Sequence, residues 1–360
     1  MSPIYGEGWG IGFNPEWEVR GLFALEEWEV GEDTIVLRGR LLVSPELAFS
    51  LLNERFSRYG YQLLMQREGE LRLVRPTSHL VAQSAPKPII NLLLLIATFF
   101  TTLFVGATYQ GANPLKDLGK LILGLPFSLA LLSILGVHEL GHYFISKKHG
   151  IKVTLPYFIP VPIGLGTFGA FIKMRSPVID RRALFDVGVA GPLAGLVVAI
   201  PILVLGLKLS EVVPAGKFGI SLGSPLLFSL IVWLTLGSIP HGFDVVLHPV
   251  AFAGWIGFFV TALNLLPVGQ LDGGHISYAL LGRKQEKVAM ATFVALFLMG
   301  ILYWQGWLTW SLLVLFMGLK HPPPLNDLTL LDEGRQRLGV FMAILFFTLI
   351  TPSPFSFPHF

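Results

Sequence analysis

The stretch VHELGHYF, Val137 to Phe144, places two histidines and a glutamate inside a long apolar segment. From residue 121 to residue 144, that glutamate is the only acidic or basic residue apart from the histidines. A charged side chain inside a bilayer is costly and by default indicates function. His138 and His142 are four residues apart, so on a helix both imidazoles project from one face, one turn apart. The stretch therefore predicts a membrane-spanning helix that carries a functional site.

The composition of the whole chain also indicates a membrane protein. Of its 360 residues, 53% are hydrophobic and only 14% are charged, which is too apolar for an ordinary soluble protein of this length. The net charge is +3, and no block of lysines and arginines resembles a nucleic-acid patch, so we expect no nucleic-acid partner. The chain has no cysteine, which excludes disulfides and thiolate metal ligands. The first ten residues, MSPIYGEGWG, predict neither a signal peptide nor a transit peptide.

Residues 1–75 are predicted to form a small soluble α+β domain, because their charges are mixed with apolar residues. DTIVLRGRLL, residues 33–42, is typical of a strand. In the next segment Ser44 is placed to cap a helix that ends before Gly60. YQLLMQREGELRLVR, residues 61–75, then predicts a strand hairpin. The expected order is strand, helix, strand, strand, and residues 76–88 are expected to be a linker.

From residue 89 onward apolar segments dominate the sequence. Residues 89–351 are predicted to be a mainly α-helical, polytopic membrane domain of about seven transmembrane helices, followed by a tail over residues 352–360. The last two candidate spans are short for a bilayer core. The candidate spans are residues 89–108, 121–144, 183–207, 249–271, 288–304, 306–319 and 338–351.

A further apolar segment, Ser224–Leu236, decides the orientation of everything after it. The lysines and arginines within residues 147–152, 173–182 and 283–287 fall on one side of the membrane only if this segment does not cross. Such positive clusters mark the cytoplasmic side. We therefore expect Ser224–Leu236 to be re-entrant or interfacial, and the N-terminal domain to lie in the cytoplasm.

The spacing of His138 and His142 suits a metal ion, because both imidazoles can reach one tetrahedral zinc at about 2.0–2.1 Å. Glu139 projects about a quarter-turn further round the helix, where it can accept a proton from a zinc-bound water. The alternative is a polar cluster that joins helices. In a membrane that alternative is weaker, since Glu139 and both histidines would each need a partner. One Zn²⁺ per chain is predicted, with Glu139 as the catalytic base.

A catalytic zinc takes three protein ligands and keeps one open position, so a third ligand is required. Asp272 lies at the end of an otherwise uncharged apolar segment, 130 residues after His142 (272 − 142 = 130). On the predicted topology, Asp272 and the histidines lie near the cytoplasmic side of the membrane. Read alone, Asp272 is an ordinary helix-terminal carboxylate before a Gly-Gly turn. Beside the histidine motif it is the predicted third ligand.

Together these motifs resemble the signature of the site-2 proteases, which are intramembrane zinc metalloproteases. That signature is His-Glu-x-x-His in one transmembrane helix and Asn-x-x-Pro-x-x-x-x-Asp-Gly in a later one. This chain has HELGH at residues 138–142 and NLLPVGQLDG at residues 264–273, and the resemblance covers roughly residues 85–350. It implies a metalloendopeptidase with zinc bound by both histidines and Asp272, and with Asn264 beside the substrate carbonyl. From its chemistry alone, Asn264 could instead serve as a polar contact between helices.

Two glycine-containing stretches agree with this resemblance. VPIGLGTFGAFIKM, Val161 to Met174, is too broken for a helix and resembles the family's membrane-embedded β-hairpin, whose exposed edge can pair with an unwound substrate. In AGPLAG, residues 190–195, Gly191 and Gly195 lie one turn apart and predict close packing of another helix. The predicted substrate-binding residues are Gly164, Gly166, Gly169 and Phe171.

The soluble N-terminal domain, including NERFSRYGYQ at residues 53–62, looks like the cyanobacterial and chloroplast branch of the family, the ethylene-dependent gravitropism-deficient and yellow-green type. That resemblance suggests a multi-pass bacterial protein of a cyanobacterial plasma or thylakoid membrane. The family cleaves membrane-anchored proteins, often anti-sigma factors or precursors of transcription factors. Proteins of that kind are the implied partners.

Two other functions are alternatives. A polytopic transporter would use the buried histidines and carboxylates as an ion path, but it predicts broken segments in two repeated halves, and no such repeat is apparent. A catalytically silent binding protein with a structural metal site should lack a metal ligand or the catalytic base. The sequence has all three predicted ligands and the predicted base, namely His138, His142, Asp272 and Glu139.

Overall fold

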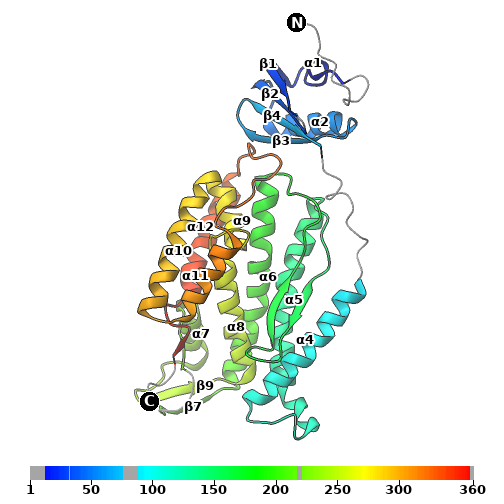
Figure 1. Ribbon diagram of the computed structural model, residues 1–360. Coiled ribbons are helices and arrows are strands. Elements are labelled where there is room, and N and C mark those ends of the chain that lie inside the picture. Colours follow the sequence, from blue (N-terminus) through cyan, green and yellow to red (C-terminus); the bar gives the residue numbers. More distant parts are fainter. Residues whose placement is uncertain (1–12, 32, 76–87, 217–220, 357–360) are drawn as a thin grey trace. The chain divides into compact units, whose positions relative to one another are not determined.

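Figure 1 shows the computed structural model, which describes residues 13–31, 33–75, 88–216 and 221–356. The first ten residues, nearly all of the predicted linker and the last four residues of the predicted tail lie outside this description. The chain divides into two compact units. The first unit comprises Met1–Ala85, Pro177–Leu184 and Pro323–Leu331, and the second comprises Pro86–Ser176, Phe185–Pro322 and Asp332–Phe360.

The first unit is built on a four-stranded antiparallel sheet in the order β1-β2-β4-β3. The predicted helix and hairpin are present, and the Ser44 hydroxyl caps the helix by accepting the amide of Leu47. A buried core of apolar side chains fills the space between the sheet and this helix. The elements are α1 (Pro15–Glu18), β1 (Phe23–Val30), β2 (Thr34–Leu41), α2 (Pro45–Ser57), β3 (Gln62–Arg67) and β4 (Glu70–Val74).

The predicted order of elements missed α1 and the edge strand β1. The sequence of β1, FALEEWEV, carries three glutamates, a residue type that is depleted in strands. Pairing with β2 compensates, because Arg38 on β2 lies 2.6 Å from the carboxylate of Glu27 and 3.3 Å from that of Glu29. This partner is 9 to 11 residues away along the chain, so a local pattern does not reveal it.

Two segments from far along the chain complete the β3 edge of this sheet. Met65 of β3 donates its amide to the Leu325 carbonyl (2.7 Å) and accepts the amide of Asp327 (2.8 Å). Asn326 in turn donates to the carbonyl of Ile179 (2.8 Å). An ion pair of 2.7 Å between Arg181 and the buried carboxylate of Asp327 joins the two added segments. The first unit is therefore assembled from three separate parts of the chain.

The second unit consists mainly of helices, with three two-stranded ribbons. The helices are α4 (Pro88–Tyr109), α5 (Leu125–Lys148), α6 (Arg181–Lys208, which begins in the first unit), α7 (Leu226–Leu236), α8 (Pro249–Asn264), α9 (Asp272–Leu281), α10 (Gln285–Leu302), α11 (Gly306–Met317) and α12 (Glu333–Leu349). Short 3₁₀ helices, η1 (Leu118–Gly124) and η2 (Gly282–Lys284), precede α5 and α10. The ribbons pair β5 (Tyr157–Pro160) with β6 (Thr167–Phe171), β7 (Glu211–Pro214) with β9 (Phe243–Val246), and β8 (Ser221–Leu222) with β10 (Phe355–Ser356).

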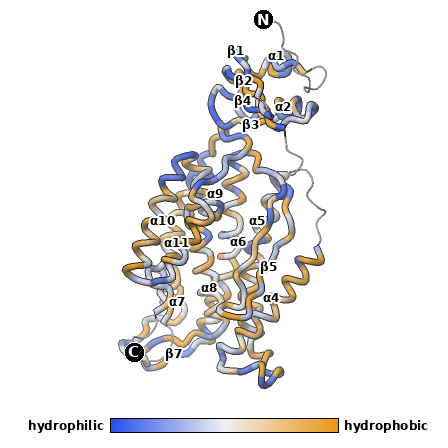
Figure 2. Tube along the Cα trace, viewed as in Figure 1, coloured by the Kyte–Doolittle hydropathy of each residue, from blue (hydrophilic) through white to orange (hydrophobic). Residues whose placement is uncertain are grey.

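The helices of the second unit have the length and apolar composition of a membrane protein. Within the described ranges, four helical segments are long and apolar enough to cross a bilayer: Pro88–Tyr109, Leu118–Lys148, Arg181–Lys208 and Asp272–Leu302. Figure 2 shows hydrophobic colours along much of their length. The count of seven spans stays a prediction, as does the re-entrant course of α7. With its 11 residues α7 is about 16 Å long, roughly half the thickness of a bilayer core.

One predicted span, residues 249–271, is wrong in its last seven residues, which are not helical. Helix α8 ends at Asn264, and turns follow up to Leu271. Pro267 lacks the amide that would continue the helix, and Gly269 has a φ of +51°, which a helix does not allow. This break separates α8 from α9 and so sets the position where α9 begins.

A β-hairpin is present, but its first strand precedes the predicted segment of residues 161–174, and its place within the membrane stays a prediction. β5 and β6 pair antiparallel, with Tyr157 opposite Phe171. Polar side chains of α4 hold the hairpin along its length. Asn91 donates to the carbonyls of Leu155 and Pro156 (both 2.9 Å), Thr101 to that of Gly166 (2.7 Å) and Tyr109 to that of Gly164 (2.6 Å).

Candidate metal centre

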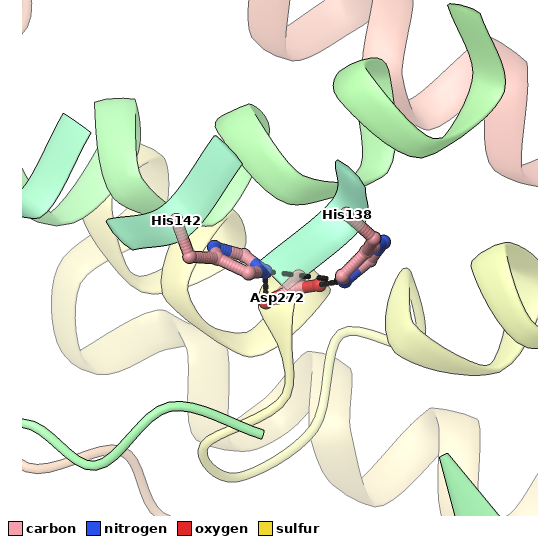
Figure 3. A group of neighbouring side chains, drawn as sticks. All are labelled: His138, His142 and Asp272. Carbon is pink, nitrogen blue, oxygen red and sulfur yellow. Dashed lines mark hydrogen bonds and ion pairs between the residues drawn. The ribbon is translucent and has the colours of Figure 1, made fainter. Parts of the chain in front are cut away.

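His138, His142 and Asp272 meet at one point (Figure 3). The two histidines lie one turn apart on α5, and Asp272 is the first residue of α9. The Nε2 atoms of the histidines are 3.2 Å apart. The Asp272 carboxylate lies 3.3 Å from Nε2 of His138 and 3.2 Å from Nε2 of His142. The three side chains are 6%, 8% and 12% exposed, so the cluster is enclosed.

These distances fit a tetrahedral zinc ion. A tetrahedron with metal–ligand bonds of about 2.0–2.1 Å has edges of about 3.3–3.4 Å. The two Nε2 atoms are separated by nearly this distance, and each of them lies at a similar distance from one oxygen of Asp272, Oδ2 for His138 and Oδ1 for His142. Two imidazoles and one carboxylate are also a donor set of the kind that zinc takes in hydrolytic enzymes. The three residues therefore fit zinc in both chemistry and geometry.

Close contact between α5 and α6 depends on glycines of both helices. A Cβ atom at Gly191 would lie 2.0 Å from Nε2 of His142, and one at Gly195 would lie 3.2 Å from Nδ1 of His138. A Cβ at Gly141, inside the histidine motif, would lie 2.6 Å from the Ala190 carbonyl oxygen. Close packing was predicted for Gly191 and Gly195, but their neighbours are the two imidazoles themselves. These glycines provide the space that the histidines occupy.

The Gly-Gly pair after Asp272 places α9 against the end of α8. A Cβ atom at Gly273 would lie 2.0 Å from the Leu265 carbonyl oxygen, and one at Gly274 would lie 2.3 Å from that of Gly269. Neither position accepts a side chain while the turn keeps its course. The DGG sequence thus brings the carboxylate of Asp272 to the histidines through backbone packing.

The orientation of the His142 ring is fixed from the opposite side. Its Nδ1 lies 2.8 Å from the carbonyl oxygen of Val187 on α6. A carbonyl only accepts, so this contact requires the proton on Nδ1 and leaves Nε2 as the lone-pair donor toward Asp272 and His138. Such an outer partner sets both the tautomer and the direction of a metal-binding histidine.

Glu139 and Asn264 both border this cluster. Glu139 is buried on α5, next to the first histidine, and its carboxylate lies near the backbone of Ile172, directly after β6. Asn264 is the last residue of α8, and its Nδ2 lies 3.3 Å from Nε2 of His138. The pattern alone did not predict that the end of the hairpin reaches Glu139.

The four predicted substrate-binding residues divide into two pairs. Gly164 and Gly166 lie in the turn, where their carbonyls accept hydrogen bonds from α4. Gly169 and Phe171 lie in β6, the strand that leads to Ile172 and Glu139. A Cβ atom at Gly169 would meet open space, and Phe171 is 48% exposed. Only Gly169 and Phe171 lie within three residues of Ile172, whose backbone is near Glu139.

Sequence reasoning missed Asp186, whose carboxylate lies one residue before Val187 in α6. The signal was visible, because Asp186 is an acidic residue within a predicted apolar span and such residues mark function by default. The role of Val187 had no comparable signal, since a backbone carbonyl is the same at every position.

A comparison with known protein families matches a region of the chain that contains the two histidines and Asp272. Residues 126–302 match the family model described as peptidase family M50. Over these residues the chain has a peptidase family M50 domain. Three curated plant relatives agree with the predicted branch of that family. The chain is 31% identical to "Probable zinc metalloprotease EGY2, chloroplastic" of Arabidopsis thaliana over 258 residues, which is 70% of this chain and 45% of that protein.

Two further relatives carry the name "Probable zinc metalloprotease EGY1, chloroplastic". The protein from Oryza sativa subsp. japonica is 32% identical over 323 residues, covering 86% of this chain and 54% of the relative. The protein from Arabidopsis thaliana is 36% identical over 235 residues, covering 63% and 42%. The chain thus spans about half the length of these curated relatives. No solved structure matches it.

Proposed function

We propose that this chain is an intramembrane zinc metalloendopeptidase that hydrolyses peptide bonds within the transmembrane segments of membrane-anchored proteins. The observation that carries the proposal is the convergence of two imidazoles and a carboxylate at tetrahedral spacing, with Glu139 beside them. The peptidase family M50 domain and three relatives named as zinc metalloproteases support the same activity.

In this proposal His138, His142 and Asp272 hold the zinc, and Glu139 is the base. Zinc held by these residues would supply a Lewis acid that activates water for attack and polarises a carbonyl. Glu139 accepts the proton of the attacking water and passes it to the leaving amine. Asn264 can donate its side-chain amide to the carbonyl oxygen of the substrate, because its Nδ2 already points at the ligand cluster.

The hairpin provides a place for the substrate backbone. A peptide bond in a transmembrane helix is shielded until a local stretch unwinds, and the exposed amides then need partners. Within the described ranges β6 pairs with β5 alone, so its other edge is available for an added strand. That strand would run past Gly169 and Phe171 toward Glu139, while α4 holds the turn at Gly164 and Gly166.

The finer parts of the proposal rest on the positive-inside pattern and on the family resemblance. They are seven spans, a membrane-embedded hairpin, an N-terminal domain on the cytoplasmic side, and a cyanobacterial plasma or thylakoid membrane. The substrate type is an anti-sigma factor or a transcription-factor precursor. A polytopic transporter, or a silent protein with a structural metal, is less favoured because Glu139 lies beside a complete ligand set.

Three purified forms of the full chain in detergent test this function. We expect the wild type to carry about one zinc ion and to cleave a reporter transmembrane segment. Glu139→Gln should keep the zinc and lose cleavage by about 10²–10⁴-fold, since it removes only the base. Asp272→Ala should lose most of the zinc. Near wild-type cleavage by Glu139→Gln would contradict the mechanism, and unchanged zinc content in Asp272→Ala would contradict the third ligand.

A further inference from the structure

The carboxylate of Asp186 takes no part in the proposed chemistry, yet Asp186 is the one acidic residue of α6 and its carboxylate has two basic partners. Arg335 of α12 donates Nε to its Oδ1 and Nη2 to its Oδ2, both at 2.7 Å. Nε2 of His149 lies 2.9 Å from the same Oδ2. The Arg335 contact is a planar fork, the strongest geometry available to a carboxylate. The side chains of Asp186 and Arg335 are 24% and 29% exposed, so the fork is partly shielded from water.

These contacts tie three helices together at one point. His149 is the residue that ends α5, and its backbone amide donates to the carbonyl of Ile145. It follows His142 by two helical turns (149 − 142 = 7), so the two histidines lie on the same face of α5. Both meet α6 at adjacent residues: His149 meets Asp186, and His142 meets Val187. The Asp186 cluster therefore fixes α5 against α6 beside the contact that orients a metal ligand.

We propose that Asp186, held by Arg335 and His149, is a positioning residue for the metal centre, because it sets the register of α5 on α6 in which the Val187 carbonyl orients His142. This inference rests on the proposed zinc site. A shift of one residue along α6 moves a carbonyl by about 1.5 Å, which is enough to lose the hydrogen bond to Nδ1. The same shift would move Gly191 away from the His142 ring.

The test uses the full chain in detergent and measures zinc affinity by competition with a chelator. Asp186→Asn keeps the shape but loses the charge that holds the fork. We expect zinc to bind about 10–100-fold more weakly, as is typical when an outer partner of a metal ligand is lost. Arg337→Gln is the matched control, because it breaks an exposed ion pair with Glu333 on the same helix. The control should bind zinc like the wild type.

A second variant and a second readout separate positioning from general stability. Arg335→Lys keeps the positive charge but cannot form the fork, and it should weaken zinc by a similar factor. In both variants the absorption bands of bound Co²⁺ should change, because they report the ligand geometry, which a loss of stability at constant geometry would leave unaltered. If Asp186→Asn does not fold, the zinc affinity and the Co²⁺ spectrum of Arg335→Lys test the positioning role of Asp186 by themselves.

The outcomes are distinguishable from failure of the proposed function. A wild type that binds no zinc in this assay overturns the metal site itself. A wild type that binds zinc, with Arg335→Lys matching it in affinity and in its Co²⁺ spectrum, overturns the role of Asp186 and leaves the metal site intact.

Discussion

In the sheet of the first unit, Leu37 and Leu63 are fully buried, whereas in the helical unit Phe316 is 90% exposed. The polar side chains reverse this pattern: Arg38 and Glu27 of the sheet face outward, while Thr102 and Ser128 of the helices are fully buried and hydrogen-bonded to each other. The sheet unit thus keeps its charged side chains outside an apolar core, whereas the helical unit exposes large apolar side chains and buries some polar ones. In a membrane, buried polar groups of this kind mark the places where a water-consuming site can be built.

The largest expected effect concerns the space inside the helical unit. Gly191→Ala puts a Cβ atom onto Nε2 of His142, so we expect zinc affinity to fall by more than the roughly 10–100-fold typical of a lost outer partner. Gly136→Ala on α5 is the control, because its nearest neighbour would be 3.9 Å away. Zinc titration of the three proteins measures the difference. Equal affinity in Gly191→Ala would mean that α6 does not pack on the ligands.

The second prediction compares apolar residues in the two units. Leu63→Ala should destabilise the first unit by about 2–5 kcal/mol, because it leaves a cavity in a closed core. Phe316→Ala, at an exposed position of α11, should change the free energy of unfolding by only about 0.5 kcal/mol or less. Hydrogen exchange on the full chain in detergent resolves both regions. A large loss at Phe316 would contradict a lipid-facing assignment for that side chain.

The third prediction tests the edge of the hairpin. Gly169 has a φ of +94°, which proline cannot adopt, so Gly169→Pro should deform β6. Loss of about one substrate hydrogen bond, roughly 1.4 kcal/mol, corresponds to cleavage about tenfold slower. Phe171→Pro should act alike, and zinc content should stay the same in both. Helix-breaking residues in a substrate should speed its cleavage. Unchanged cleavage across such a proline scan would rule out strand addition.

The smallest expected effect concerns Tyr61 in the first unit. Burial raises the pKa of its phenol above the usual value near 10. The neutral form is therefore favoured in the folded state, so its contribution to stability is complete below pH 10 and is lost as the pH rises through the folded pKa. Tyr61→Phe should reduce the stability that the first unit loses at alkaline pH, which hydrogen exchange between pH 9 and 11 measures. A stability profile over pH identical to that of the wild type would contradict a raised pKa of Tyr61.

Local patterns were sufficient for elements whose reason is local. The cap at Ser44 predicted helix α2, and the segment of residues 61–75 predicted the hairpin of β3 and β4. They were insufficient for β1, where ion pairs with Arg38 offset two of the three glutamates, Glu27 and Glu29. They also failed after Asn264, where Pro267 and Gly269 end a stretch that is apolar throughout. Hydropathy measures composition, and backbone geometry decides where a helix stops.

The sequence by itself determined which chemical groups this protein can bring to a metal ion. Two histidines four residues apart offer two ligands on one helix face whatever the surrounding fold, because ligand type and helical spacing are local properties, and Asp272 was predicted to be the third ligand. Only the tertiary structure decided what holds that set in place. Gly191 gives room to His142, the Val187 carbonyl orients it, and Asp186 ties α6 to α5 and α12. These contacts join residues 37 to 149 positions apart and in part use backbone atoms, which are the same at every position and leave no mark in a sequence.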